Sequence, residues 1–392
     1  MTPSFSLIPV LYLLGAAHGL FLAFVLLTRS PGSARANRYL GCYTLVFVAA
    51  LVDYFIELTG LERSLIGLRT LLWPKEFLYG VLVYFYTREM TTPGRYVLRG
   101  RQWWHFALPL LHVAVTWPLL LLPGDTQFAI LNDQPGPQFL QRAWALLLGD
   151  AELVVTVVQL TVYLGLSLRL IRRHQKRLPQ TFSYREKVNL SWLRNLLVGT
   201  FAVYFIWLAA EFLNLEESLD AGLDFALGLS MVLLIYSMSI LGLRQPRIFA
   251  AVPADARPDI GTVESVSRDH EQKYRNSALS AEMSGQLMRE VDALMHREKP
   301  YLDGSLSLPQ LAARMNISSN YLSQAINQHA GQNFFDYINA HRVEEVKALM
   351  RKQPDQTVLD LALDAGFNSK SAFYTAFRRH AGKTPGQYRK TL

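Results

Sequence analysis

The chain has 392 residues, of which 51% are hydrophobic and 18% are charged, and its mean hydropathy is +0.14. These values exclude a disordered or fibrous chain and argue against a wholly soluble protein. The single cysteine, Cys42, excludes an intramolecular disulfide and a cysteine-rich zinc site, and the formal net charge of +8 points to nucleic acid, anionic lipid or both as partners.

Apolar stretches repeat from the N-terminus to about Leu243, each close to the ~20 residues that an α-helix needs to cross a bilayer. The first stretch has no Lys or Arg before Arg29 and no clear cleavage site after it, so we expect it to be retained rather than removed as a signal peptide. Its Gly15 and Gly19 form a GxxxG pattern, which favours either close helix packing or dimerisation. The pattern predicts seven membrane spans, near residues 6–27, 39–58, 68–87, 105–122, 143–168, 196–213 and 221–243.

Basic residues are concentrated in alternate connections between the predicted spans. The segments after spans one, three, five and seven hold most of the arginines and lysines, whereas the other connections are mostly acidic. Because basic connections remain in the cytoplasm, the sequence predicts an N-terminus outside the membrane and a C-terminal part in the cytoplasm.

Ionisable residues also lie inside the predicted spans, where charge is costly and often functional. The carboxylates among them fall in the predicted outer halves of their helices and favour a site for a cationic or hydrogen-bonding ligand, with the lysine neutralised by a carboxylate. The alternative is that they cap helices or pair within the bundle. The candidate sensing residues are Asp53, Glu57, Lys75, Asp150, Glu152, Glu211 and Asp224.

The segment 249–279 contains prolines and many charges without apolar periodicity, which predicts a linker. It would join a transmembrane domain over 1–248 to a soluble domain over 280–392. In that domain an apolar stripe between Leu287 and Met295 predicts a helix that packs on the elements after it or, alternatively, serves as a dimer or signalling helix.

The soluble domain contains an internal repeat. The two copies are offset by 50 residues before a turn and by 51 after it, and each reads as two helices joined by a short turn and closed by a glycine. An apolar stripe over 333–350 predicts one long helix between the copies. The repeated residues are Leu311-Ala312 and Leu361-Ala362, Ile317 and Phe367, Leu322 and Phe373, Ile326 and Phe377, and His329-Ala330-Gly331 and His380-Ala381-Gly382.

The second copy and the tail carry a family resemblance. The run Ala365 to Ser371, followed by Phe373, Phe377, Gly382-Lys383-Thr384-Pro385 and Tyr388-Arg389, makes roughly the last 95 residues resemble the AraC/XylS family of bacterial transcription regulators. The part before the linker is similar to the multi-helix membrane sensors of some family members. The resemblance implies an all-α chain: a seven-transmembrane-helix bundle followed by a soluble AraC-type domain with two helix-turn-helix motifs.

In this family the second helix of each motif enters the major groove of DNA. With Leu322 and Ile326 toward the core, the first such helix presents outward Asn320, Ser323, Gln324 and Asn327. Amide side chains pair with adenine, so this motif is expected to carry much of the base discrimination. The second motif presents more basic groups, which suit phosphate contacts. Its expected DNA-binding residues are Lys370, Ser371, Tyr374, Thr375, Arg378, Arg379 and Lys383.

The sequence therefore predicts a sequence-specific DNA-binding transcription regulator of the bacterial cytoplasmic membrane that couples a membrane signal to promoter binding. Its expected partners are promoter DNA, the lipid bilayer, RNA polymerase, a signal ligand and a second copy of the chain. No catalytic signature is found, so no enzymatic activity, cofactor or metal is expected. The alternative is a membrane transporter, channel or enzyme that carries an accessory DNA-binding module.

Overall fold

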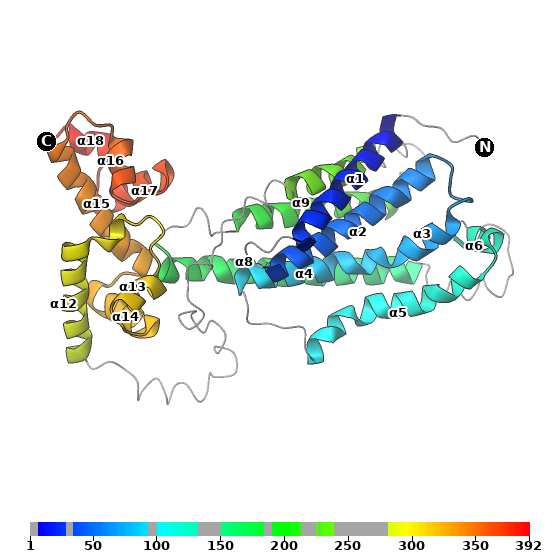
Figure 1. Cartoon of the computed structure of the whole chain (residues 1–392), viewed down its shortest axis with the longest axis horizontal. Coiled ribbons are helices and arrows are strands. Elements are labelled where there is room, and N and C mark those ends of the chain that lie inside the picture. The colour runs from blue at the N-terminus through cyan, green and yellow to red at the C-terminus, as the bar shows by residue number, and fades with distance from the viewer. Residues whose placement is uncertain are drawn as a thin grey trace. The chain divides into compact units, whose positions relative to one another are not determined.

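The computed structural model describes residues 7–28, 34–92, 100–131, 150–183, 190–212, 225–226, 228–238 and 281–392. Within these ranges every regular element is helical, apart from one isolated antiparallel bridge between Phe182 and Ser307. The chain divides into two compact units (Figure 1). The first contains Met1–Ile171 and Ser191–Pro246, and the second contains Arg172–Leu190 and Arg247–Leu392.

The first unit is a bundle of helices, in which α1 packs on α2 and α2 packs on α4. Helices occupy the described parts of all seven predicted spans. The elements are α1 (Leu7–Thr28), α2 (Ala34–Leu58), α3 (Ile66–Leu72), η1 (Trp73–Phe77), α4 (Leu78–Thr91), η2 (Gly100–Phe106), α5 (Ala107–Thr116), η3 (Trp117–Leu121), α6 (Gly124–Leu131), α8 (Asp150–Thr181), α9 (Ser191–Phe212) and the segment Gly228–Met238.

Four of the described helical stretches are long and apolar enough to cross a membrane. They are Leu7–Thr28, Arg35–Leu58, Gly100–Leu121 and Glu152–Thr181, and Gly228–Met238 is a shorter apolar helix. The count of seven spans therefore stays a prediction.

The two glycines of the first span lie where neighbouring helices approach α1. A Cβ atom built on Gly15 would lie 2.6 Å from a methyl group of Val232, and one built on Gly19 would lie 2.6 Å from a methyl group of Val48. Both distances are shorter than van der Waals contact, so the absent side chains allow the close approach. Of the two interpretations of the GxxxG pattern, close packing is the one found within this chain.

The predicted third span is not one continuous helix. The chain runs from α3 through the 3₁₀ turn η1 into α4, and Pro74 stands in the first turn of η1. Proline has no amide hydrogen and its ring clashes with the preceding helical turn, which explains the break at this point. The break places Lys75 and Glu76 on the turn between two helices.

Helix α8 has 32 residues, a length of about 48 Å at ~1.5 Å per residue. It exceeds a ~30 Å hydrocarbon core and runs on through the basic residues that follow the predicted fifth span. The predicted membrane domain over 1–248 included this segment, whereas contacts place Arg172–Leu190 with the second unit. The predicted linker over 249–279 lies outside the described residues.

The second unit has two apolar cores that share helix α15. Phe334, Tyr337 and Ile338 of α15 belong to the first core, and Val343 and Val346 belong to the second. The predicted connecting helix is thus confirmed. The elements are α12 (Ala281–Glu298), η5 (Pro300–Leu302), α13 (Leu308–Arg314), α14 (Ser319–Ala325), η6 (Ile326–Ala330), α15 (Phe334–Lys352), α16 (Val358–Asp364), α17 (Lys370–Ala381) and α18 (Pro385–Arg389).

The stripe between Leu287 and Met295 lies on α12 and is buried in the first core. This agrees with the simpler interpretation of the stripe, in which the helix packs on the elements that follow it.

Candidate DNA interface and candidate ligand pocket

The two helix-turn-helix copies have the same order of helices and turns, and their capping residues occupy corresponding positions. The N-caps Ser307 of α13 and Thr357 of α16 are 50 residues apart, whereas the N-caps Ser318 of α14 and Ser369 of α17 are 51 apart. The extra residue therefore lies in the second turn, as the sequence predicted. The first backbone N–H groups of a helix have no partner within the helix, and the side chain of an N-cap residue can accept a hydrogen bond from one of them. The serines and the threonine therefore set where each helix begins.

Both second helices end on a glycine in the left-handed region. Gly331 has φ +62° and Gly382 has φ +70°, so these residues are the predicted C-caps. In the first copy the last five residues, Ile326–Ala330, form a π-helical turn, and α14 with this turn spans the same twelve positions as α17. The second helix of the first motif (α14 with η6) and that of the second motif (α17), called the first and second reading helices below, therefore have equal length.

The first reading helix has one buried and one accessible face. Leu322 and Ile326 are fully buried in the first core. The predicted DNA-binding residues occupy the other face, where Asn320 and Asn327 are exposed and Ser323 and Gln324 are half-buried.

Tyr321, which is not among the predicted DNA-binding residues, also lies on the accessible face. Its side chain is 43% exposed beside Asn320.

The second reading helix repeats this arrangement with basic side chains. Phe373 and Phe377 are fully buried, and all seven predicted DNA-binding residues are exposed. At the 51-residue offset, Asn320 corresponds to Ser371 and Asn327 to Arg378. The chain thus presents two equivalent polar faces that differ in charge.

Arg379 has a structural contact as well as exposure. Its Nη1 atom lies 2.6 Å from the Oδ1 atom of Asp336 on α15, and the Asp336 side chain is only 6% exposed. The arginine side chain is 61% exposed. It therefore ties α17 to the shared helix while leaving part of its guanidinium accessible.

A buried arginine joins three segments of the second unit. Arg342 of α15 is 1% exposed, and its Nε atom donates to the carbonyl oxygen of Tyr301 at 2.7 Å. Its Nη2 atom donates to the carbonyl oxygen of Asp303 at 2.9 Å, and its Nη1 atom donates to that of Ser183 at 3.0 Å. Five N–H donors in a fixed fork make arginine suited to bridging several acceptors.

Ser183, just beyond the end of α8, is held on both sides. Its hydroxyl donates to the carbonyl oxygen of Leu306 at 2.6 Å and accepts from Nη2 of Arg342 at 3.1 Å. The preceding residue, Phe182, forms the antiparallel bridge to Ser307. Along the helix before it, His174, Leu178 and Phe182 are all buried and share one face. The end of α8 is therefore part of the second unit.

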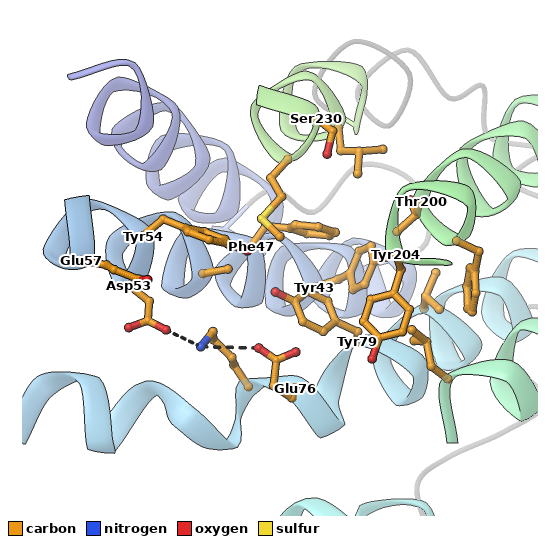
Figure 2. Close-up of a pocket in the computed structure, with 17 residues that line it drawn as sticks. Tyr43, Phe47, Asp53, Tyr54, Glu57, Glu76, Tyr79, Thr200, Tyr204 and Ser230 are labelled. Carbon is orange, nitrogen blue, oxygen red and sulfur yellow. Dashed lines mark hydrogen bonds and ion pairs between the residues drawn. The ribbon is translucent and has the colours of Figure 1, made fainter. Parts of the chain in front are cut away.

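A cavity of about 230 Å³ lies in the first unit, and Figure 2 shows its lining. It unites three predicted sensing residues, Asp53, Glu57 and Lys75. Lys75 Nζ lies 2.9 Å from Asp53 Oδ2 and 3.5 Å from Glu76 Oε1, as the dashed lines in Figure 2 mark. The expected neutralisation of the lysine by a carboxylate is present in this geometry.

A second cation, Arg69, contacts two carboxylates that line the pocket. Arg69 Nε lies 2.7 Å from Asp53 Oδ1, and other nitrogens of the same guanidinium lie 3.2 Å from Glu57 and 3.4 Å from Glu62. This arginine is absent from the predicted sensing set, because its distance from Asp53 in the sequence gave no sign of the contact.

Among the remaining predicted sensing residues, Glu152 is described and does not line this pocket. Glu152 Oε1 lies 3.2 Å from His112 Nε2. The helices α8 and α9 contain Asp150 and Glu211, whose side chains lie outside the described structure, as does all of Asp224. Within the described residues no group of three or more His, Cys, Asp and Glu side chains is placed to hold a metal ion.

Comparison with known proteins concerns the second unit. A family model for a helix-turn-helix domain matches residues 311–391. The melibiose operon regulatory protein of Escherichia coli K12 is 35% identical over 88 residues, which are 22% of this chain and 29% of that protein. The transcriptional regulator MtrA of Neisseria gonorrhoeae is 26% identical over 40% of this chain and 51% of its own length.

A solved structure from Listeria innocua, of a protein with unknown function, is 29% identical over 26% of this chain and 93% of its own, with a TM-score of 0.23. The chain covers 29% of the length of the melibiose operon regulatory protein and 51% of that of MtrA, so it spans only part of these regulators. The matched residues coincide with the two capped helix pairs and the helix between them. The C-terminal part of this chain is an AraC-type helix-turn-helix domain.

Proposed function

We propose that the chain is a membrane-bound transcription regulator, in which the helical bundle controls how the two helix-turn-helix motifs bind promoter DNA. The lipid bilayer, RNA polymerase, a signal ligand and a second copy of the chain are its proposed partners. The proposed location is the bacterial cytoplasmic membrane, with the N-terminus outside and the second unit in the cytoplasm.

Support for DNA binding comes from the two reading faces and from the names of the relatives. Each face carries polar side chains on a helix whose opposite side is locked in a core, as recognition helices require. The relatives in Escherichia coli and Neisseria gonorrhoeae are named as a regulatory protein and a transcriptional regulator.

Support for a membrane comes from the outer surface of the bundle. Large apolar side chains there are widely exposed, among them Leu14 at 60%, Phe21 at 66% and Phe24 at 64% on α1. Contiguous apolar surface of this kind is costly in water and favourable in lipid. The helices that carry it include those long enough to span.

The observation that carries the coupling is the docking of Ser183 in the second unit. Helix α8 starts in the bundle, and its final residues lead directly into the contacts with Arg342 and Leu306. A ligand can shift an equilibrium only through different interactions in two states. Docking and release of this segment would supply the two states. The signal would then not have to pass through the proline-containing linker.

The test uses a single hydroxyl group. After genome-wide mapping of the DNA bound by the full chain, transcription from the mapped promoter is compared between wild type and Ser183→Ala. Loss of a hydrogen bond to a charged group costs about 1.5 to 3 kcal/mol, so we expect a several-fold change in transcription at unchanged protein level. Gln180→Ala, at an exposed position three residues earlier, should leave it unchanged.

A second control separates docking from general stability. Thr357→Ala removes the N-cap of α16, at a cost of about 1 kcal/mol, without touching α8. If this variant alters transcription as Ser183→Ala does, or if Ser183→Ala behaves as wild type, the coupling is refuted. A reporter that works only outside the membrane, fused after Leu392, should be silent, and its activity would overturn the topology.

A further inference from the structure

The cavity of the first unit is lined by charged, aromatic and aliphatic side chains. Its lining comes from α2, η1, α4, α8, α9 and the segment Gly228–Met238, so it is enclosed by the elements that form the bundle. In Figure 2 the carboxylates of Asp53 and Glu57 lie toward one end of the labelled residues, and Tyr79 and Tyr204 lie toward the other. A ligand would therefore meet a charged end and an aromatic end.

The charged end is acidic. Three carboxylates line the cavity, those of Asp53, Glu57 and Glu76, together with one cation, Lys75. Lys75 is closer to Asp53, at 2.9 Å, than to Glu76, at 3.5 Å. Arg69 also pairs with Asp53 and Glu57, so the three lining carboxylates face two cations. The remaining excess of negative charge favours a positively charged ligand and disfavours an anion.

The aromatic end reinforces this preference. Six aromatic residues line the cavity, and the negative faces of aromatic rings attract organic cations. The lining aromatic residues are Tyr43, Phe47, Tyr54, Tyr79, Phe201 and Tyr204.

One lining hydroxyl has no hydrogen-bond partner among the described residues. The Oη atom of Tyr79 is buried and unpaired. A buried polar group without a partner costs about 1 to 3 kcal/mol, and a bound molecule is one way to satisfy it. This observation is independent of the carboxylates.

We propose that the cavity binds a small organic amine, whose ammonium group pairs with the carboxylate of Glu76 and whose apolar body packs against the tyrosines. The cavity of about 230 Å³ has room for a small molecule. As the signal ligand, this amine rests on the proposed function. Its binding is measured without DNA, so either proposal can fail alone.

The test compares three probes of nearly equal shape on the purified full chain in lipid nanodiscs. Phenethylamine carries an ammonium, 2-phenylethanol is neutral and phenylacetate is an anion. A ligand that binds only the folded state raises the unfolding midpoint. We expect millimolar phenethylamine to raise it and the other two to leave it unchanged, with a matching order in calorimetric titration.

Two variants with opposite expected effects guard against a general loss of folding. Glu76→Gln should weaken phenethylamine binding at least tenfold, whereas Lys75→Met removes the competing cation and should strengthen it. Asp125→Asn, at an exposed carboxylate that pairs with Arg63 outside the lining, is the matched control and should bind as wild type. Equal stabilisation by 2-phenylethanol, preference for phenylacetate, no response to phenethylamine, or an equal response to Na⁺ or Mg²⁺ alone would each overturn the proposal.

Discussion

The two halves of the DNA-binding domain share one helical pattern but differ in charge and in what they contact. No lysine or arginine occurs from Asn316 to His341, which includes the whole first reading helix, whereas α17 contains Lys370, Arg378 and Arg379. Conversely, the segment before α13 receives the end of α8, through the contacts of Leu306 and Ser307. The first half thus combines exposed amide side chains with the contact to the end of α8, and the second half carries the positive charge.

This difference teaches how a duplicated motif can divide its work. Phosphate contacts give affinity that depends on salt but not on sequence, whereas contacts to base edges give discrimination. In the proposed regulator, a change at the docked end of α8 would act first on the half that carries the amide side chains. The shared helix α15 would carry the effect to the half that carries the basic ones.

The largest effect is expected from the two cores, and it tests whether the halves are separable. Phe377→Ala in the second core should lower the free energy of unfolding by about 3 to 5 kcal/mol, and Leu322→Ala in the first by about 2 to 5 kcal/mol. Because α15 belongs to both cores, either variant should speed hydrogen exchange in both halves, measured by mass spectrometry on the full chain.

Leu359→Ala changes an exposed leucine of α16 and should have little effect. Faster exchange confined to the half that carries the substitution would show that the halves unfold independently, and α15 would then be a tether rather than a shared core element.

The next effect concerns reading and anchoring. If Gln324 contacts a base edge as proposed, Gln324→Ala should cost about 1 to 3 kcal/mol and relax the preference at one base pair. Arg378→Ala should weaken binding to all sequences and reduce the salt slope by about one unit. Binding isotherms on the mapped promoter and on single-base variants, at several salt concentrations, measure both.

Arg378→Lys keeps the charge and should keep the salt slope, which makes it the control for the second substitution. If Gln324→Ala and Arg378→Ala scale every sequence alike, the contrast between the halves is only one of composition and has no counterpart in DNA recognition.

The smallest expected effect is the pH dependence of the stability of each half. Burial lowers the pKa of His341, which stacks on Tyr301 in the first half, and burial together with Arg379 lowers the pKa of His380 in the second. Each histidine binds a proton more readily in the unfolded chain, so the stability that it contributes is present above pH ~6.5 and is lost as the pH falls through its folded pKa.

Unfolding midpoints measured from pH 7.5 to 5 at constant salt should therefore decline. His341→Gln and His380→Gln should each flatten the decline, and the half in which local exchange responds identifies the histidine concerned. A decline that keeps its full slope in both variants would assign it to other groups.

Much of the second unit could be predicted because its signals are local. The repeat, the C-cap glycines and the apolar stripe of α15 each follow from spacing along the chain, and the structure places them as expected. The turn of the second motif adds a constraint from a distant segment: Gly366 has φ +89°, and a Cβ there would lie 2.5 Å from the carbonyl oxygen of Tyr301. Only glycine fits there.

The pocket and the docking of α8 could be predicted only in part. The costly charges of Asp53, Glu57 and Lys75 were visible as charges within apolar runs, but their union with Tyr79 and Tyr204 depends on how separate helices pack. The contact of Ser183 with Arg342 joins residues 159 positions apart. Periodicity carries no information on such pairs, and the basic segment after Leu168 resembled a connection rather than the continuation of a helix.

The contacts of Arg342 also bear on which substitutions the domain tolerates over generations. Three of its acceptors are main-chain carbonyl oxygens, those of Tyr301, Asp303 and Ser183, which every amino acid possesses. A codon change at Tyr301 or Asp303 therefore preserves the acceptor, and one at Ser183 preserves its carbonyl oxygen but not the hydroxyl that also accepts from Arg342. A change in the arginine codon removes all the donors at once. Substitutions are therefore tolerated better at the positions that contribute carbonyl oxygens than at Arg342.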